Sequence, residues 1–215
     1  MKKIKYLIMG LVTVFGAASC ADFLEVEPKD RVTGNALLSS DGGINAYMAG
    51  HYYNLPIEEL MAVMDNAVKK GYTFAWGSDV SEQGFSRDGI AVMPDAAKES
   101  ELSGSDMARW TGLTAADKRR ELFTKPFPEK DITQEMRQVA FDNWETTDDH
   151  GMVIYGIAKD QNGKEYFMVK NSWGKSGKYD GIWYASKAFV AYKTMNILVH
   201  KDALPKEIAK KLGIK

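Results

Sequence analysis

The chain has 215 residues, enough for one domain with an appendage and for a sizeable hydrophobic core. Its 28 lysines and arginines nearly balance its 29 aspartates and glutamates, so no strong field indicates nucleic acid or an anionic membrane surface as a partner. The single cysteine excludes an internal disulfide framework and a cysteine-rich zinc site, and only three histidines remain as other soft ligands. We therefore expect neither a metal nor a cofactor.

Residues 1–20 have the pattern of an export signal. Three lysines within the first five residues precede an apolar run, Tyr6 to Phe15, that is too short to span a membrane. Small residues at positions 17–19 followed by Cys20 resemble a bacterial lipobox, whose cysteine becomes a lipid-bearing thioether. The resemblance implies a lipid anchor at Cys20 and a place in the cell envelope, most naturally the outer membrane. The alternative is a leader with an incidental cysteine.

Residues 21–57 change character and predict a loop-rich segment. A short run near its start resembles the mature start of SusD-like (RagB-type) glycan-binding lipoproteins of the outer membrane: Asp22-Phe23-Leu24-Glu25-Val26-Glu27-Pro28. Those proteins are far larger, so the glycan-binding part would be absent here. His51 stands alone in this segment, and we expect a solvated or packed histidine rather than a ligand.

Residues 58–143 predict three helices, one strand and a long irregular segment. Apolar side chains recur at helical spacing from 58 to about 70, and residues 72–76 favour a strand. The segment 77–109 is rich in Gly, Ser and Asp and predicts irregular structure with brief ordered pieces. A short capped helix is expected at 114–118, and a longer one at 133–143.

A polar residue is expected to mark the start of each of these two helices. Thr114 is expected to cap the first of them, with Asp117 as the capping-box carboxylate. Asp131 is expected to frame the start of the second.

The hydrophobic period then changes from that of helices to that of strands. Residues 151–158 and 165–169 are β-rich, and the Asn162-Gly163 pair between them is a strong hairpin signal. Further strands and short helices are expected in the order strand 182–185, helix 187–192, strand 195–200 and helix 206–211. Strands flanked by helices, without βαβ alternation, predict an α+β fold.

The residues that carry chemistry bracket this hairpin. His150 precedes the first strand, and Asn171 and Trp173 follow the second. A cysteine peptidase needs a histidine to take the thiol proton and later protonate the leaving amine, and a third group that fixes the imidazole tautomer. The amide oxygen of Asn171 can accept the ring N–H, and Trp173 can shield that hydrogen bond from water. Gly151 and Gly174 are expected to allow close approach around the pair.

The order and spacing of His150 and Asn171-Ser172-Trp173-Gly174 resemble those of papain-like cysteine peptidases. Over residues 58–215 the resemblance extends to the branch of bleomycin hydrolase and aminopeptidase C. Three further stretches carry it: Tyr72-Thr73-Phe74-Ala75-Trp76-Gly77, Asp79-Val80, and Val190-Ala191-Tyr192-Lys193.

The resemblance implies a particular fold and activity. The fold is the papain-like right-hand half-domain, a barrel-like antiparallel sheet with flanking helices. The activity is that of an aminopeptidase acting on peptides with a free amino terminus, and the assembly is a hexameric ring. The chain end, Ile214 and Lys215, would lie in the cleft and limit cleavage to free amino termini.

The family's nucleophile is missing from the sequence. Papain-like enzymes carry it in a Cys-Gly-Ser-Cys-Trp-like text preceded by a glutamine that donates to the oxyanion. Here the one cysteine is Cys20 in the leader, and the first glutamine is Gln83. We therefore expect a cysteine aminopeptidase fragment that is inactive alone. We also expect a chimeric chain, in which the sequence changes from one family resemblance to the other between Asn54 and Glu59.

Other interpretations remain open at this point. A histidine beside Asp148 and Asp149 can be a salt-bridged surface residue. The Asn171-Ser172-Trp173-Gly174 sequence can likewise form an ordinary turn. The two aspartates also suggest a Ser, His, Asp triad, although no Gly-x-Ser-x-Gly elbow is present. The alternative function is a non-enzymatic envelope lipoprotein whose β-rich half is an interaction module. His200 is expected to be structural.

Hairpin geometry sets a condition on the catalytic pair. If Asn162-Gly163 formed a two-residue turn, Asn171 would face Ile154, four residues from His150. At roughly 3.4 Å per residue that is too far for contact. We therefore predict a bulge, a wider loop, or a turn centred nearer Asp160 and Gln161.

Overall fold

The computed structural model describes residues 52–214. The chain divides after Asn54 into two units, and the description below concerns the second. The expected leader, the SusD-like segment up to residue 51, Cys20 and His51 lie outside the described residues, so what the sequence predicts for them stays a prediction. No helix between residues 52 and 214 has the length and apolar character that crossing a membrane requires. In the same range no three His, Cys, Asp or Glu side chains gather as a metal site would need.

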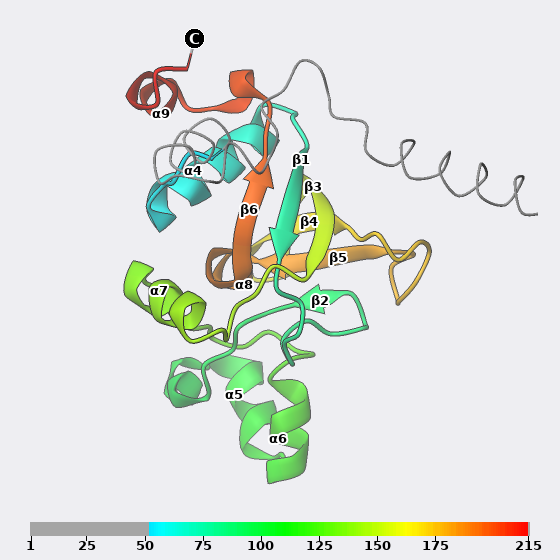
Figure 1. The fold of residues 1–215 in the computed structure, drawn as a ribbon. Helices are drawn as coiled ribbons and strands as arrows, with labels where there is room; N and C mark the ends of the chain where they lie inside the picture. The colour runs from blue at the N-terminus through cyan, green and yellow to red at the C-terminus, as the bar shows by residue number, and fades with distance from the viewer. Residues whose placement is uncertain (1–51, 215) are drawn as a thin grey trace, which may run out of the picture. The chain divides into compact units, whose positions relative to one another are not determined.

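A six-stranded sheet organises the second unit (Figure 1). Its order is β2-β5-β4-β3-β1-β6, and neighbouring strands are antiparallel except for the parallel pair of β2 and β5. The strands are β1 (Phe74–Ser78), β2 (Ile90–Ala91), β3 (His150–Lys159), β4 (Glu165–Lys170), β5 (Ile182–Ser186) and β6 (Thr194–Leu198). The predicted α+β class, an antiparallel sheet with flanking helices, is confirmed, and the sheet is open between its edge strands β2 and β6.

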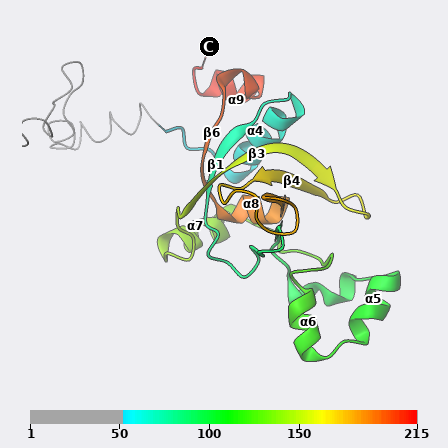
Figure 2. The ribbon, with the colours of Figure 1, turned by 90° about the vertical axis from the view of Figure 1, so that its right-hand side faces the viewer.

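Helices precede the sheet, interrupt it and follow it. They are α4 (Ile57–Lys69), η1 (Ala96–Glu101), α5 (Gly104–Thr111), α6 (Ala115–Glu121), α7 (Gln134–Asp142), α8 (Lys187–Lys193), η2 (Lys201–Ala203) and α9 (Lys206–Lys211). Both views place α5 and α6 at the opposite end of this unit from α9 (Figures 1 and 2). Each helix expected between residues 58 and 211 forms, with ends that differ from the expected ones by at most three residues.

The core fills one face of the sheet. Side chains from α4 and α8 pack there against alternate residues of the central strands, and the cluster includes Met64, Ala67, Phe189, Val190, Trp76, Ile154, Phe167 and Val169. Residues of β3 that point to the opposite face, Val153 and Tyr155, keep 39% and 37% of their surface exposed. The period of two along β3 therefore separates a buried face from an open one.

Threonine side chains begin two of the helices. Thr114 Oγ1 accepts a hydrogen bond from the backbone N–H of Asp117, as the capping-box pattern predicts. In α7 the cap is Thr133, whose Oγ1 accepts from Met136 N at 3.1 Å, and the expectation of Asp131 at this position is wrong. Both hydroxyls satisfy a backbone donor that the first turn of a helix leaves free.

Helix α5 lies in the segment that the sequence predicts as irregular. It begins at Gly104, which has a positive φ of 54°, and its cap Ser103 makes no side-chain capping bond. One buried side chain holds it: the Trp110 ring packs 4.6 Å from that of Phe127, and its Nε1 donates to Glu99 at 2.9 Å. Tertiary packing of this indole, rather than local propensity, stabilises the helix.

The β3–β4 hairpin contains two of the predicted irregularities, a wider loop and a β-bulge. Its loop is five residues wide, Asp160 to Lys164, because the Asp160 carboxylate accepts N–H groups of Asn162 and Lys164 at 2.8 and 3.0 Å. The register then shifts between Ile154 and Gly156, which makes a bulge at Tyr155. The strict two-residue turn does not form, and the shifted register brings Asn171 closer to His150.

Candidate active site

His150 and Asn171 meet at one end of the sheet. His150 begins β3 and pairs with Ser78, the last residue of β1. Asn171 directly follows β4, is 2% exposed, and its backbone N–H donates to Gly181 O at 3.0 Å. The His150 Nε2 atom lies 2.7 Å from Asn171 Oδ1. The predicted contact between the two side chains is confirmed, whereas their catalytic role stays a prediction.

This contact selects a tautomer of the imidazole. An amide oxygen can only accept, so the neutral ring carries its proton on Nε2 and donates it to Asn171. The lone pair then resides on Nδ1, which makes no hydrogen bond with any residue between 52 and 214. His150 therefore holds its basic nitrogen ready to take a proton from outside the pair. Asn171 Nδ2 is buried and likewise has no partner in this part of the chain.

Trp173 covers one side of the imidazole. The two ring centroids are 4.7 Å apart with the planes tilted by 41°. The indole is itself held edge-on by Phe85 and Trp183, at centroid distances of 6.0 and 5.7 Å. Since 47% of Trp173 is exposed, it shields one side of the His150–Asn171 hydrogen bond and also presents a surface to solvent.

The two aspartates before His150 serve the backbone and neighbouring side chains. Asp149 accepts from Val80 N at 3.0 Å and from the Ser81 hydroxyl, and Asp148 accepts from Asn196 Nδ2 at 2.7 Å. Neither carboxylate contacts the imidazole within the described residues. The Asp member of a Ser, His, Asp triad is therefore absent from this geometry.

Ser172 does not complete a triad either. Its Oγ lies 3.4 Å from Nε2 of His150, the same nitrogen that donates to Asn171. A nitrogen that carries the proton is no base toward a hydroxyl. The geometry favours a nucleophile on the opposite side of the ring, at Nδ1.

A buried lysine fixes the segment that leads to His150. Lys193 is fully buried, and its ammonium donates to Glu145 O at 2.8 Å and to Thr146 Oγ1 at 3.0 Å. It also pairs with two carboxylates, that of Glu82 and that of Asp79 at 3.5 Å. We call Lys193, Asp79 and Glu82 the lysine cluster.

The lysine cluster also holds the chain just before the site, because Asp79 accepts the backbone N–H of Thr147 at 3.1 Å. In the sequence, Lys193 carries weight only through the family resemblance. Its spacing from Phe189 and Val190, four and three residues, places it on the buried face of α8, and this is the one local signal of its burial.

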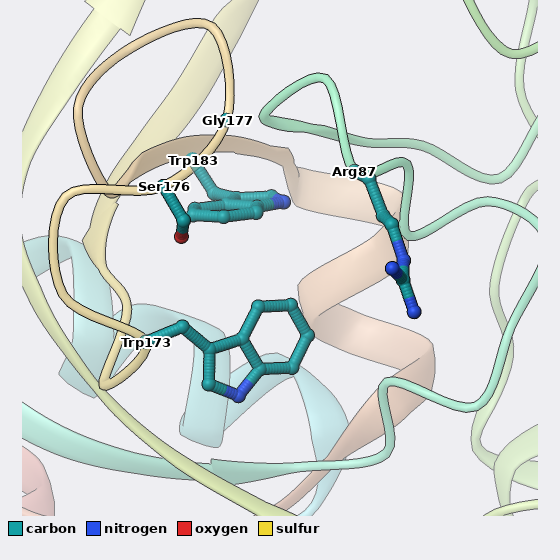
Figure 3. Close-up of a pocket in the computed structure, with 5 residues that line it drawn as sticks. All are labelled: Arg87, Trp173, Ser176, Gly177 and Trp183. Atoms are coloured by element: carbon teal, nitrogen blue, oxygen red, sulfur yellow. The ribbon is translucent and has the colours of Figure 1, made fainter.

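A cavity of about 380 Å³ is lined in part by Trp173, whose indole also packs on the imidazole. Figure 3 shows the side chains that line it, with the Trp183 and Trp173 indoles edge to face and Arg87 across from Ser176. The Trp183 indole also donates to Ser86 O at 2.8 Å, which joins the Arg87 loop to β5. Sequence reasoning singles out neither Arg87 nor Ser176, because both lie in loops without a local motif.

The expectation that Gly151 and Gly174 permit close approach is wrong. A Cβ at either position would meet nothing within 4 Å. Gly174 is required instead for its backbone, since φ is 67°. The close approach occurs at Gly181, where a Cβ would lie 2.0 Å from Gly174 O.

Ile214 lies away from the candidate site. It packs on a small cluster made by Val63, Leu204 and Ile208, which joins α4 to α9. No residue of the site belongs to this cluster. The implied placement of Ile214 in the cleft is therefore not met in this structure, and Lys215 lies outside the described residues. His200 caps η2 and stacks on Tyr72, and it lies beyond the end of β6 at Leu198 rather than inside the expected strand; its purely structural part stays a prediction.

Comparison with known proteins agrees with the resemblance in the carboxy-terminal part of the chain. Residues 128–214, less than half of the chain, match the Peptidase C1-like family. Aminopeptidase C of Streptococcus thermophilus is 27% identical over 157 residues, which are 73% of this chain and 29% of that protein. The crystal structure of PepW from Lactobacillus rhamnosis aligns with a TM-score of 0.46 and 22% identity, over 74% of this chain and 30% of PepW.

The part of the chain that carries His150 and Asn171 is thus similar in sequence to papain-like peptidases. The chain spans about three tenths of the length of the relatives it matches.

Proposed function

We propose that this chain supplies the histidine and asparagine half of a papain-like cysteine aminopeptidase site. The observation that carries the proposal is the 2.7 Å contact between His150 Nε2 and Asn171 Oδ1, which leaves Nδ1 without a hydrogen-bond partner among residues 52–214. Similarity to the Peptidase C1-like family and to an aminopeptidase C supports it. The single cysteine of the sequence, Cys20, stands in the leader, so we propose that the chain is inactive alone.

The geometry assigns each side chain a part in proton transfer. A thiol placed at Nδ1 would give its proton to His150, and the imidazolium would then protonate the amine that leaves the scissile bond. Asn171 keeps the ring in plane, and its Oδ1 accepts a hydrogen bond from the Nε2–H throughout without adding a negative charge. Trp173 limits the access of water to that hydrogen bond.

The substrate class, assembly and location follow from resemblance and belong to the same proposal. The substrates are peptides with a free amino terminus, and the chain forms a homo-oligomer. Cys20 carries a lipid anchor that holds the protein at the cell envelope. Metabolic labelling with a radioactive fatty acid tests the anchor, because a Cys20→Ala variant should lose the label while the wild-type chain retains it.

Nuclear magnetic resonance of the histidine rings tests the arrangement of the pair without requiring turnover. At high pH, His150 should be the Nε2–H tautomer with a slowly exchanging proton, and Asn171→Ala should speed that exchange and mix the tautomers. His200 is the matched control, since its Nδ1 accepts from Asp202 N at 3.3 Å and should not respond. A His150 ring unaffected by Asn171→Ala would contradict the assigned pair.

Turnover assays test the proposed inactivity. The full chain, incubated with amino-acid fluorogenic substrates under reducing conditions, should release no fluorophore, because we propose that its one cysteine, Cys20, is a lipid-bearing thioether and not a thiolate. Thiol-dependent turnover that His150→Ala abolishes and His200→Ala preserves would contradict this part of the proposal. Specific binding of a glycan by the same chain would favour the non-enzymatic lipoprotein instead.

A further inference from the structure

We propose that the cavity between Trp173, Trp183 and Arg87 binds the residue on the leaving side of the scissile bond, and that Arg87 selects a carboxylate on it. This inference rests on the proposed function, since it takes His150 as the group that protonates the leaving amine. Its chemical class of ligand is a short peptide carrying a negative charge on that residue.

The cavity has walls suited to one amino acid. Its volume is about 380 Å³, and its faces are the Trp173 and Trp183 indoles, packed edge to face at 5.7 Å. Such a volume lies at the small end of the range for ligand pockets, so it takes a single residue rather than a long segment. Aromatic walls with a few polar groups are the usual composition of a pocket that binds an organic ligand.

The position of Trp173 gives the cavity its direction. One side of the indole packs 4.7 Å from the His150 ring, and the same side chain lines the cavity. The amine that leaves must come within hydrogen-bond distance of His150 to be protonated. The residue that owns this amine therefore lies next to Trp173, the side chain that the imidazole and the cavity share.

Arg87 provides an unpaired charge at this cavity. It is exposed and makes no ion pair with any residue from 52 to 214, whereas Arg109 is paired with Asp106 and Glu121. A guanidinium binds a carboxylate through two parallel hydrogen bonds, which neutral groups cannot match. An anionic group on the leaving residue would satisfy Arg87 at the edge of the two indoles.

The backbone of Arg87 is held in place by its neighbours. Trp183 Nε1 donates to the carbonyl of Ser86 at 2.8 Å, and a Cβ on Gly177 would lie only 2.8 Å from the carbonyl oxygen of Arg87. The loop that carries Trp173 and the loop that carries Arg87 are therefore packed against each other. A guanidinium based on a fixed backbone loses less freedom on binding than one on a free loop.

Ser176 adds a polar atom to the opposite wall. Its hydroxyl oxygen is buried and has no hydrogen-bond partner within residues 52–214. A buried hydroxyl without a partner is uncommon and is satisfied when a ligand supplies one. Ser176 and Arg87 thus place one neutral and one charged donor on facing sides of the cavity (Figure 3).

Two carboxylates share this chemistry, the α-carboxylate of a dipeptide and the side chain of an aspartate or glutamate. The probes are the dipeptide Ala-Phe, its neutral amide Ala-Phe-NH₂, and Ala-Glu-NH₂, titrated into the ¹⁵N-labelled full chain. The readout is the indole N–H signals of Trp173 and Trp183, assigned with Trp173→Phe and Trp183→Phe. We expect Ala-Phe to bind about fivefold more tightly than Ala-Phe-NH₂.

The variant Arg87→Gln should remove this preference, leaving the acid and the amide with equal affinity. Lys175→Gln is the matched control, because it makes the same charge change in the Trp173 loop at an exposed residue that does not line the cavity. The thermal midpoint of Arg87→Gln should equal that of the wild-type chain. Equal affinity for Ala-Phe and Ala-Phe-NH₂ in the wild-type chain, or a preference that survives Arg87→Gln, overturns the proposal.

The two carboxylate sources separate in the third titration. Tight binding of Ala-Glu-NH₂ extends the selectivity to acidic side chains, and weak binding restricts it to dipeptides; either supports recognition by Arg87 when Ala-Phe binds tightly. Failure of the proposed function gives a different pattern. If the His150 tautomer does not respond to Asn171→Ala but binding still depends on charge, only the proposed catalytic pair is contradicted. If the tautomer is confirmed but Ala-Phe and Ala-Phe-NH₂ bind equally, only the proposed carboxylate pocket is contradicted.

Discussion

Two cations flank the candidate site in opposite circumstances. Lys193 is fully buried and paired with Asp79 and Glu82, whereas Arg87 is exposed and unpaired within the described residues. Burial of an ammonium is tolerated only with partners that replace water, so Lys193 is committed to holding the chain ahead of His150. An exposed guanidinium keeps its water and remains available to a ligand. The lysine cluster should therefore control stability, and the Trp173 side should control binding.

The largest effect is expected at the lysine cluster. Lys193→Met leaves the buried Asp79 carboxylate and the partly exposed Glu82 carboxylate without their cation, and should lower the free energy of unfolding by about 3–5 kcal/mol, mainly through Asp79. Urea denaturation followed by circular dichroism measures it. The control is Lys178→Met at an exposed position, which should change stability by no more than about 0.5 kcal/mol. A loss below about 1 kcal/mol for Lys193→Met would show that the cluster does not anchor this segment.

An intermediate effect is expected in the loop that carries Trp173. Gly174→Ala strains a residue with φ of 67° in open space and should cost about 1 kcal/mol. Gly181→Ala adds a clash with Gly174 O at 2.0 Å to a φ of 85°, and should cost about 1 kcal/mol more than Gly174→Ala. Denaturation midpoints of the two variants, compared side by side, provide the measurement. Equal losses would mean that the loop adjusts freely around Gly181.

The smallest effect on stability is expected at Trp173, although its effect on the site should be clear. Trp173→Ala removes a side chain that is 47% exposed, so unfolding should become easier by only about 1 kcal/mol. Exchange of the His150 Nε2 proton with water should become faster, because the ring loses its cover. Trp144→Ala, at an indole that is 82% exposed, is the control and should leave exchange unchanged. Unaltered exchange in Trp173→Ala would remove the shielding role.

The elements around the hairpin are predictable because their signals are local. The strand periods of β3 and β4 and the order of His150 and Asn171 predict the hairpin and its two polar ends. The register is less predictable, since Asn162-Gly163 suggests a two-residue turn while the Asp160 side chain stabilises a wider one. A contact required by chemistry nonetheless indicates that some irregularity must occur, and the bulge at Tyr155 supplies part of it.

Elements held by distant partners escape sequence reasoning. Helix α5 has a glycine at its first position and depends on Trp110 packing against Phe127, so its local text indicates irregular structure. The lysine cluster likewise joins residues from separate parts of the chain, and no local sequence pattern around Asp79 or Glu82 indicates that Lys193 is their partner. Charge pairing across the fold has no period along the chain that a sequence pattern can reveal.

The sequence by itself determined the α+β class, the hairpin and the pair of His150 and Asn171, because hydrophobic period and turn chemistry act over a few residues. Only the tertiary structure decided that Asp148 and Asp149 serve neighbouring segments of the chain, and that Arg87 lies across a cavity from Ser176. The parallel pairing of β2 with β5 accounts for the second result. It brings a loop from early in the chain beside Trp173, and long-range strand pairing depends on packing that no short stretch of sequence encodes.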